Sequence, residues 1–529
     1  MMKLKYIALS AVALVALTSC NDYLDTLPDD RAEVKTADQV KELLVSAYPM
    51  YNNNTIMEML SDNVSDNGRT YSSTALKDEL YRFEDVDDTG NDSPYMAWNG
   101  YYRSVATANE ALQDIEKLGL TESAKNLVAE AKLIRAYSMF QLANTFCMSW
   151  NPEKADEYMG LPYPKEPAKF IGGQYERGTL RQLYENINQD IEDALPNIDD
   201  NTYTVPKYHF NKKAAYAFAA RFNLFYMNYD KCIAYANEVL GSDPTSVMRD
   251  FEPYTQFGAQ DIGNKYIKSS ENANLMLLAT YSGFVYNLVY SVYPRFMHNS
   301  SIASYATFWA SAPWGKGSGS DGQKVLLYYS NMLYGTNQTV YFPKFIAQFE
   351  ITDKINQTGY LHLVDPVFTG DETLLCRAEA YVLSKDHNYD LAVKDINTWI
   401  KTHCREKASD GTERPTLTVE SINSFMNALE YSPKEIQSWS DLTIRKELHP
   451  QGFAVAEGTE ENIINLILHM RRLDNLFQGL RFIDLKRYGI EYTHLINRED
   501  PVSFNAGDLR GAVQLPSDVI KAGLPANPR

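Results

Sequence analysis

The spacing of apolar residues predicts helices along much of the N-terminal half of the chain. One set recurs every three or four positions up to Pro196, which would end a helix: Leu180, Leu183, Ile187, Ile191 and Leu195. Residues 124–150 predict a longer helix, and residues 101–118 predict its partner. Because consecutive helices joined by short loops pack against each other, we expect antiparallel helix pairs.

Two segments that lie 160 residues apart share one pattern. Each has a small residue, Ala220 or Ala380, eight positions before an Asn-Tyr-Asp triplet that begins at Asn228 or Asn388. Small residues let two helices approach closely, and Asn and Asp suit the turn between them. We interpret both as tetratricopeptide-like hairpins, although two distant copies do not form a tandem array and chance similarity is the alternative. The predicted fold class is mainly α, with helical hairpins forming a scaffold.

Between the two hairpins the composition changes. Residues 281–349 contain 17 aromatic residues, about a quarter of the segment against 12% of the whole chain, and glycines and serines interrupt them at residues 313–319. This composition is typical of loops. We therefore expect a loop-rich aromatic region, at about 250–365, packed on a helical scaffold at about 35–245 and 370–490.

The N-terminus has the pattern of a lipoprotein signal. Two lysines precede a short apolar run, and Leu17-Thr18-Ser19-Cys20 is a lipobox, so we expect removal of residues 1–19 and acylation of Cys20. A buried or disulfide-bonded Cys20 is the alternative. No later stretch reaches the roughly 20 apolar residues of a membrane helix. We expect residues 20–529 to form one body tethered by lipid.

The charge and the cysteines narrow the choice of partners. A formal net charge of −18 disfavours nucleic acid and anionic lipid surfaces as partners. The other cysteines show no Cys-x-x-Cys or zinc-type spacing, so we interpret them as small buried residues rather than as a disulfide framework: Cys147, Cys232, Cys376 and Cys404. No motif indicates a cofactor or a metal ion.

Several motifs together resemble the SusD/RagB family of outer-membrane nutrient-binding lipoproteins. In chain order they are Cys20 to Asp25 with Pro28, then Trp98, Tyr101, Tyr102 and Asn109, then Leu133 to Tyr137, then a box from Phe477 to Gly489, then Leu515-Pro516 and Asn527-Pro528. In the box, Gln478 stands for the usual Glu and Tyr488 for the usual Trp, which leaves any family ion pair at position 478 in doubt. We expect the box to be scaffold, with Arg481 and Asp484 pairing or capping a helix end and Arg487 with Tyr488 packing over it.

Catalytic signatures are missing from the sequence. There is no His-Glu-x-x-His, no phosphate loop and no Gly-x-Ser-x-Gly elbow, although a glycosidase pair can hide among 68 acidic residues. Loop aromatics are plentiful instead, and a flat ring stacks on the apolar face of a sugar while polar side chains bind its hydroxyls. The candidate binding residues are Tyr293, Arg295, Tyr305, Trp309 and Trp314, with a second polar cluster at Asp62, Asn63, Asp66, Asn67, Arg69 and Tyr71.

Trp309 and Trp314 are the strongest aromatic candidates. They flank a segment that ends in Pro313, which disfavours a helix, so we expect both indoles to be exposed. The alternative is that most of these aromatics are core or interface residues.

The resemblance implies a surface lipoprotein that is not an enzyme. It would bind oligosaccharide or polysaccharide and deliver it to a TonB-dependent, SusC-like transporter in the outer membrane. Peptide binding by a RagB-like apparatus is the nearest alternative, and a surface glycoside hydrolase is the alternative outside the family.

Overall fold

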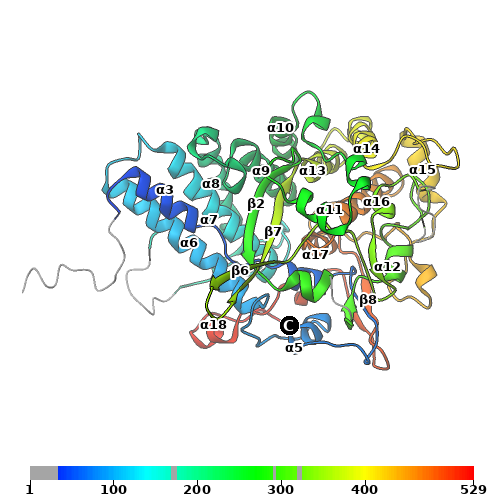
Figure 1. Cartoon of the computed structure of the whole chain (residues 1–529), viewed down its shortest axis with the longest axis horizontal. Helices are drawn as coiled ribbons and strands as arrows, with labels where there is room; N and C mark the ends of the chain where they lie inside the picture. The colour runs from blue at the N-terminus through cyan, green and yellow to red at the C-terminus, as the bar shows by residue number, and fades with distance from the viewer. Residues whose placement is uncertain (1–33, 168–174, 290–292, 318–324) are drawn as a thin grey trace, which may run out of the picture.

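Helices are the main secondary-structure element of the molecule (Figure 1). The computed structural model describes residues 34–167, 175–289, 293–317 and 325–529. In the N-terminal part the helices are α3 (Ala37–Ser46), α4 (Asn54–Met59), α5 (Ala75–Tyr81), α6 (Pro94–Lys117), α7 (Lys125–Phe146), α8 (Leu180–Ala194), α9 (Lys212–Phe225) and α10 (Tyr229–Leu240). Those that follow are α11 (Ala259–Tyr266), α12 (Ser300–Tyr305), α13 (Gly370–Leu383), α14 (Tyr389–His403), α15 (Val419–Asn427), α16 (Thr459–Asp474), α17 (Leu480–Arg487) and α18 (Ser517–Lys521).

The helices predicted from spacing are confirmed, and local signals explain their ends. Helix α8 begins at Leu180 because Thr179 and Gln182 form a capping box, and it ends at Ala194, just before Pro196. Helix α6 begins after Ser93, whose side chain accepts a hydrogen bond from the backbone of Met96. It packs antiparallel against α7, which in turn packs against α8.

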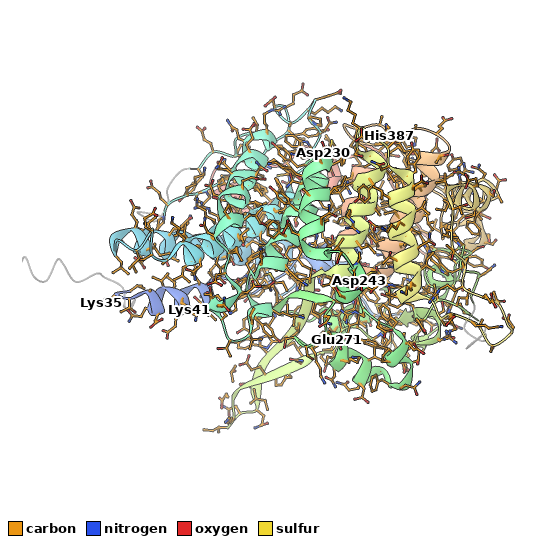
Figure 2. The ribbon with its side chains drawn as sticks, turned by 90° about the horizontal axis from the view of Figure 1, so that it is seen from above. Lys35, Lys41, Asp230, Asp243, Glu271 and His387 are labelled. Carbon is orange, nitrogen blue, oxygen red and sulfur yellow. The ribbon has the colours of Figure 1, made fainter. Side chains whose placement is uncertain are left out.

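Both predicted hairpins are present. Helices α9 and α10 form the first and α13 and α14 the second, and α10 packs against α13, so the two copies adjoin in space. Figure 2 shows Asp230 and His387, which mark the two turns, at the same edge of the molecule. Ala220 and Ala380 are fully buried, as close helix packing requires. The chain between the hairpins therefore loops out of a helical stack and returns to it.

That intervening chain contains a sheet that apolar spacing did not predict. Strands β2 (Asn274–Tyr281), β7 (Thr358–Thr369) and β6 (Gln348–Asp353) pair antiparallel in the order β2-β7-β6, with Leu277 opposite Pro366 and Phe349 opposite Leu361. Helix α9 packs on both β2 and β7. Short two-stranded pairings join β1 (Ser65–Asp66) to β3 (Phe296–Met297), β4 (Tyr334–Thr336) to β5 (Thr339–Tyr341) and β8 (Tyr492–His494) to β9 (Val502–Phe504).

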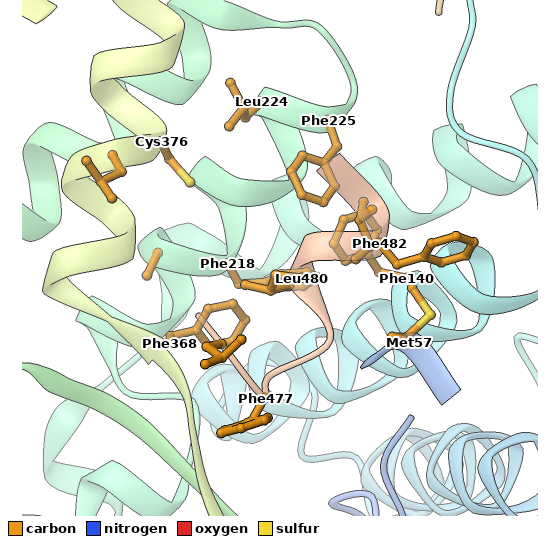
Figure 3. Close-up of a cluster of buried hydrophobic side chains, with 14 of the residues drawn as sticks. Met57, Phe140, Phe218, Leu224, Phe225, Phe368, Cys376, Phe477, Leu480 and Phe482 are labelled. Carbon is orange, nitrogen blue, oxygen red and sulfur yellow. The ribbon is translucent and has the colours of Figure 1, made fainter. Parts of the chain in front are cut away.

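Aromatic rings hold the scaffold together where several elements meet (Figure 3). Phe218 of α9 lies 5.8 Å from Phe140 of α7 and 5.7 Å from Phe368 of β7, measured between ring centroids. Leu480 of α17 is also buried in this cluster. Each such side chain contributes about 1.5–3 kcal/mol by burial. The core therefore joins residues that lie hundreds of positions apart in the sequence.

The cysteines behave as predicted. Cys147, Cys232, Cys376 and Cys404 are buried and unbonded to one another. Burial raises the pKa of the Cys147 thiol to about 11, which makes it unreactive at neutral pH. Cys20 and the signal at residues 1–19 lie outside the described residues. Within the described residues, no helix has the length and apolar character needed to cross a membrane.

Candidate functional site

Two of the predicted clusters, more than 200 positions apart in sequence, meet on one surface. Strands β1 and β3 pair, and beyond them the backbone of Ser72 donates a hydrogen bond to the carbonyl of Tyr293 (2.9 Å) while Arg295 N–H donates to the carbonyl of Ser72 (2.9 Å). These bonds bring Tyr71, the neighbour of Ser72, close to Tyr293, and Arg69 precedes Tyr71 in the same turn. We call Arg69, Tyr71 and Tyr293 the seam surface.

The seam surface presents aromatic and charged groups to solvent. Tyr293 is 69% exposed, the Arg69 side chain is 54% exposed and Tyr71 is partly exposed. Arg69 forms an ion pair with Glu499, and Arg82 binds the other oxygen of that carboxylate at 2.7 Å. These hydrogen bonds and charges lower the pKa of Glu499, which keeps the carboxylate ionised. The surface thus combines exposed tyrosines with a fixed charged network.

Arg295 has a different role from the one expected. Its guanidinium binds both oxygens of Asp66 (3.1 and 3.0 Å) and one oxygen of Asp78 (2.8 Å), and the side chain is only 11% exposed. Arg295 therefore stabilises the seam surface from the interior of the protein and does not face solvent. The remaining polar candidates are also internal: Asp62, Asn63, Asp66 and Asn67 make hydrogen bonds or ion pairs within the fold.

Helix α12 is tied to β1 at its first turn. Asn299 caps its first turn and donates hydrogen bonds to Ser65 Oγ (2.5 Å) and Asn67 Oδ1 (3.0 Å), which ties the helix to β1. Tyr305 at the end of the helix is partly exposed, and the Lys316 ammonium lies 5.8 Å from its ring centroid. Trp309 is also partly exposed. Tyr305 and Trp309 are thus both accessible, as predicted.

Trp314 corrects the expectation that both indoles are exposed. It is 3% exposed and lies 5.2 Å from Trp399 and 5.8 Å from His469, measured between ring centroids. The cause is a tight turn in which Ala312 and Gly315 exchange backbone hydrogen bonds, with Gly315 at a φ of +106°. This turn points the indole into the core, so Trp314 supports the fold.

The box from Phe477 to Gly489 is buried and heavily paired. Arg481 binds Asp62 through two hydrogen bonds (2.7 and 2.9 Å), not Asp484 as expected. Asp484 instead contacts Arg471 (3.1 Å) and Arg487 (3.2 Å). All of these side chains are at most 12% exposed. Such a network links α16 and α17 to the chain before β1.

The exchange of Glu for Gln at position 478 has a local explanation. The Gln478 amide donates to Asp365 Oδ1 (3.0 Å) and to the carbonyl of Pro366 (3.0 Å), while its oxygen accepts from the Lys344 ammonium (2.9 Å). A carboxylate here would lose both donated bonds and face Asp365. An amide is therefore well suited to this position.

Sequence reasoning missed a large cleft between α6 and α18. Its volume is about 920 Å³, and its lining includes Trp98, Tyr102 and Tyr175 together with Arg177. Trp98 and Tyr102 are four residues apart on α6, with ring centroids at 4.7 Å, and that spacing is the one signal the sequence offered. The described residues contain no group of three or more His, Cys, Asp or Glu side chains placed to hold a metal ion.

Comparisons with known proteins agree with this architecture. A family model described as SusD-like, starch-binding and associating with the outer membrane matches residues 22–224. A SusD superfamily protein from Bacteroides thetaiotaomicron shares the fold over 93% of this chain and all of its own, with 18% identity and a TM-score of 0.63. Residues 22–224 thus resemble the SusD-like family, and nearly the whole chain has the fold of SusD superfamily structures.

Other SusD-like structures share the fold at similar identity. A protein from Bacteroides vulgatus described as a putative sugar-binding protein is 17% identical, covers 94% of this chain and 99% of its own, and has a TM-score of 0.65. A structure described as a laminarin-binding SusD-like protein is 15% identical, covers 94% of this chain and all of its own, and has a TM-score of 0.55. No curated protein sequence matches the chain.

Proposed function

We propose that this SusD-like chain is a lipid-anchored protein of the outer cell surface that binds carbohydrate at the seam surface. It then delivers the carbohydrate to a TonB-dependent, SusC-like transporter. The observation that carries the proposal is the meeting of two sequence-distant clusters at one exposed place, where Tyr71 and Tyr293 lie beside Arg69. Tyr305 and Trp309 are further accessible aromatic residues, on and just after α12.

The residue types at the seam surface suit a sugar. Tyrosine rings offer flat apolar faces for the C–H side of a pyranose, and Arg69 offers donors for its hydroxyls. The ion pair between Arg69 and Glu499 and the hydrogen bonds of Arg295 below the surface restrict movement before a ligand arrives. A surface ordered in advance loses less entropy on binding.

We further propose that the bound sugar is not cleaved. A glycosidase needs one carboxyl group that is protonated at working pH and a second that is free to act as base or nucleophile. At the seam, Asp66 and Asp78 bind Arg295, and Glu499 binds Arg69 and Arg82. Each carboxylate is thus paired with arginine, which suits charge balance rather than acid catalysis.

Anchoring and delivery rest on the N-terminal pattern and on the family. Cys20 in its lipobox supports attachment through acyl chains, and the family description of outer-membrane association supports the location. The sugar- and laminarin-binding relatives support carbohydrate over peptide as the ligand. We also propose that residues 20–529 act as a single body, since β1–β3 and β2–β7 pair segments far apart in sequence.

The proposal is tested by the double variant Tyr71→Ala with Tyr293→Ala. Each stacked ring contributes about 0.5–1.5 kcal/mol, so the affinity should fall about five- to a hundredfold if both rings contact the ligand. Isothermal calorimetry of the mature protein in detergent, against a panel of polysaccharides and peptides, measures the change. Tyr208→Ala is the matched control, since Tyr208 is 39% exposed and lies on a short 3-10 helix that contacts β2.

Three outcomes distinguish the possible binding sites and ligand classes. Weaker polysaccharide binding in the double variant alone supports the seam surface. Equal affinity in all three proteins places the ligand elsewhere, with the α6–α18 cleft as the next site to test. Binding of peptides alone, or shortening of the polysaccharide during incubation, contradicts the proposed function.

A further inference from the structure

A small cleft opens beside the seam surface and is lined by cationic side chains. It lies between α12, β8 and the segment that includes the 3-10 helix η9 (Trp439–Asp441), and its volume is about 50 Å³. Pro433 and Trp439 lie at its exposed side. Lys446 and Arg472 line it together with Asp62. The cleft is therefore reachable from solvent but charged inside.

Lys446 is a buried amine that forms no ion pair with a carboxylate of the described residues. Its side chain donates one hydrogen bond, to the hydroxyl of Ser432 (2.7 Å), and no carboxylate of the described residues lies within 4 Å of its ammonium. Burial lowers the pKa of Lys446 to about 7, and Arg472 and Arg481 add to this effect against the attraction of Asp62. An ammonium that is buried and unpaired is costly, because it loses its hydration without gaining a counter-charge.

The carboxylate that lines the cleft, Asp62, is already shared. Asp62 accepts two hydrogen bonds from Arg481 (2.7 and 2.9 Å) and lies 3.3 Å from Arg472. Three cationic side chains thus surround a single carboxylate. His494, which also lines the cleft, places its ring nitrogens 2.8 and 3.0 Å from the carbonyl oxygens of Tyr81 and Ser61, and burial lowers its pKa while these two carbonyls oppose the shift. The interior of the cleft therefore carries excess positive charge.

We propose that this cleft binds a small oxyanion group, and that in the natural ligand the group is the carboxylate of an acidic sugar. The assignment of the group to a sugar carboxylate rests on the proposed function. Ser65 of β1 and Ile302 of α12 line the cleft, Asn299 hydrogen-bonds to both of these residues, and β1 leads along the chain to the seam surface. A saccharide on the seam surface would thus lie next to Lys446 and Arg472. A carboxylate would supply the counter-charge that Asp62 leaves incomplete.

Calorimetry with matched ligands tests this. The probes are an oligogalacturonide, its neutral methyl ester and sodium phosphate, each titrated at constant ionic strength into the mature protein. If the carboxylate enters the cleft, the acid should bind about thirtyfold or more tightly than the ester, as expected for a buried charge contact. Lys446→Met should remove that difference. Lys407→Met is the control, because Lys407 is 58% exposed and pairs with Glu413.

Each outcome has a defined meaning. A preference for the acid that is lost only in Lys446→Met supports the whole proposal. If phosphate binds and depends on Lys446, while acid and ester bind equally, the oxyanion site stands and its source is a free ion. Equal binding of acid and ester with no phosphate binding overturns it.

If Lys446→Met does not fold, the comparison of acid, ester and phosphate binding to the wild-type protein still tests the oxyanion site. Binding of neutral polysaccharide reports separately on the proposed function, since neutral ligands do not need the cleft. If the protein binds no saccharide but binds phosphate in the cleft, the proposed function is contradicted and the oxyanion site is supported.

Discussion

Glu379 gives the sharpest test of whether the box from Phe477 to Gly489 is scaffold. The carboxylate lies on α13 and is fully buried, where it accepts hydrogen bonds from Arg487 (2.7 Å) and the Tyr488 hydroxyl (2.7 Å) at one oxygen. Its other oxygen accepts from Arg471 (3.2 Å). Glu379→Gln keeps the shape but removes the charge and turns an amide donor toward arginine donors.

The expected cost is large. Removing one partner of a buried ion pair costs about 3–5 kcal/mol, because the remaining charges lose their compensation. Here Asp484 would be left as the one acid facing two arginines. Against a typical total stability of about 5–15 kcal/mol, such a loss is readily measured. Carbohydrate binding should persist in the folded variant, since Glu379 is buried away from solvent.

The effect should also depend on pH. Burial alone would raise the pKa of Glu379, but Arg487 and Arg471 together hold it below its usual value. A group with a lowered pKa stabilises the fold above its unfolded pKa, about 4.3, and loses that contribution as the pH falls through the folded pKa. The gap between wild type and Glu379→Gln should thus be full at pH 7 and shrink below about pH 4.

Guanidinium unfolding followed by tryptophan fluorescence at pH 7 and below pH 4 measures both effects. Glu413→Gln is the control, because Glu413 is 80% exposed and should change the free energy of unfolding by less than about 0.5 kcal/mol. A Glu379→Gln variant as stable as wild type at pH 7 would refute the reasoning. Loss of saccharide binding in a folded variant would place the box in the binding site.

Further predictions concern the anchor, the core and the partner. Cys20→Ala should move the protein from the membrane fraction to the soluble fraction, and unchanged fractionation would contradict lipidation. Trp314→Ala should lower stability by about 3–5 kcal/mol through the cavity it leaves, whereas the partly exposed Trp309→Ala should cost much less, as thermal melting of both will show. Mild detergent extraction should co-purify a much larger membrane protein, and a monodisperse monomer would count against a transporter complex.

Local signals in the sequence were enough to predict the helices. The apolar spacing of α8 and the turn triplets at Asn228 and Asn388 act within a few residues, so the elements they specify are readable without a partner. The sheet could not be predicted from the sequence pattern. Strand β2 is almost continuously apolar and buried, and β7 contains Pro366, so neither shows the alternation that marks a half-exposed strand.

For the candidate site too, the sequence allowed the residue types to be predicted but not the contacts between them. Residue types suitable for sugar binding were visible in the sequence, and Tyr293 is indeed exposed. Whether a given side chain is free depends on partners far along the chain: Arg295 is held by Asp66, and Trp314 is covered by Trp399. The joining of the two clusters depends on hydrogen bonds across more than 200 positions, such as Ser72 to Tyr293. Spacing along a single chain carries no information about such contacts.

Hydroxyl-radical footprinting with and without a bound polysaccharide tests the central claim most directly, because it reports binding and its location together. The account predicts that a polysaccharide protects Tyr71 and Tyr293 from oxidation while Tyr208, which is also exposed, reacts equally in both samples. Unchanged oxidation of Tyr71 and Tyr293 in the presence of a saturating polysaccharide, with protection elsewhere on the chain, would contradict it.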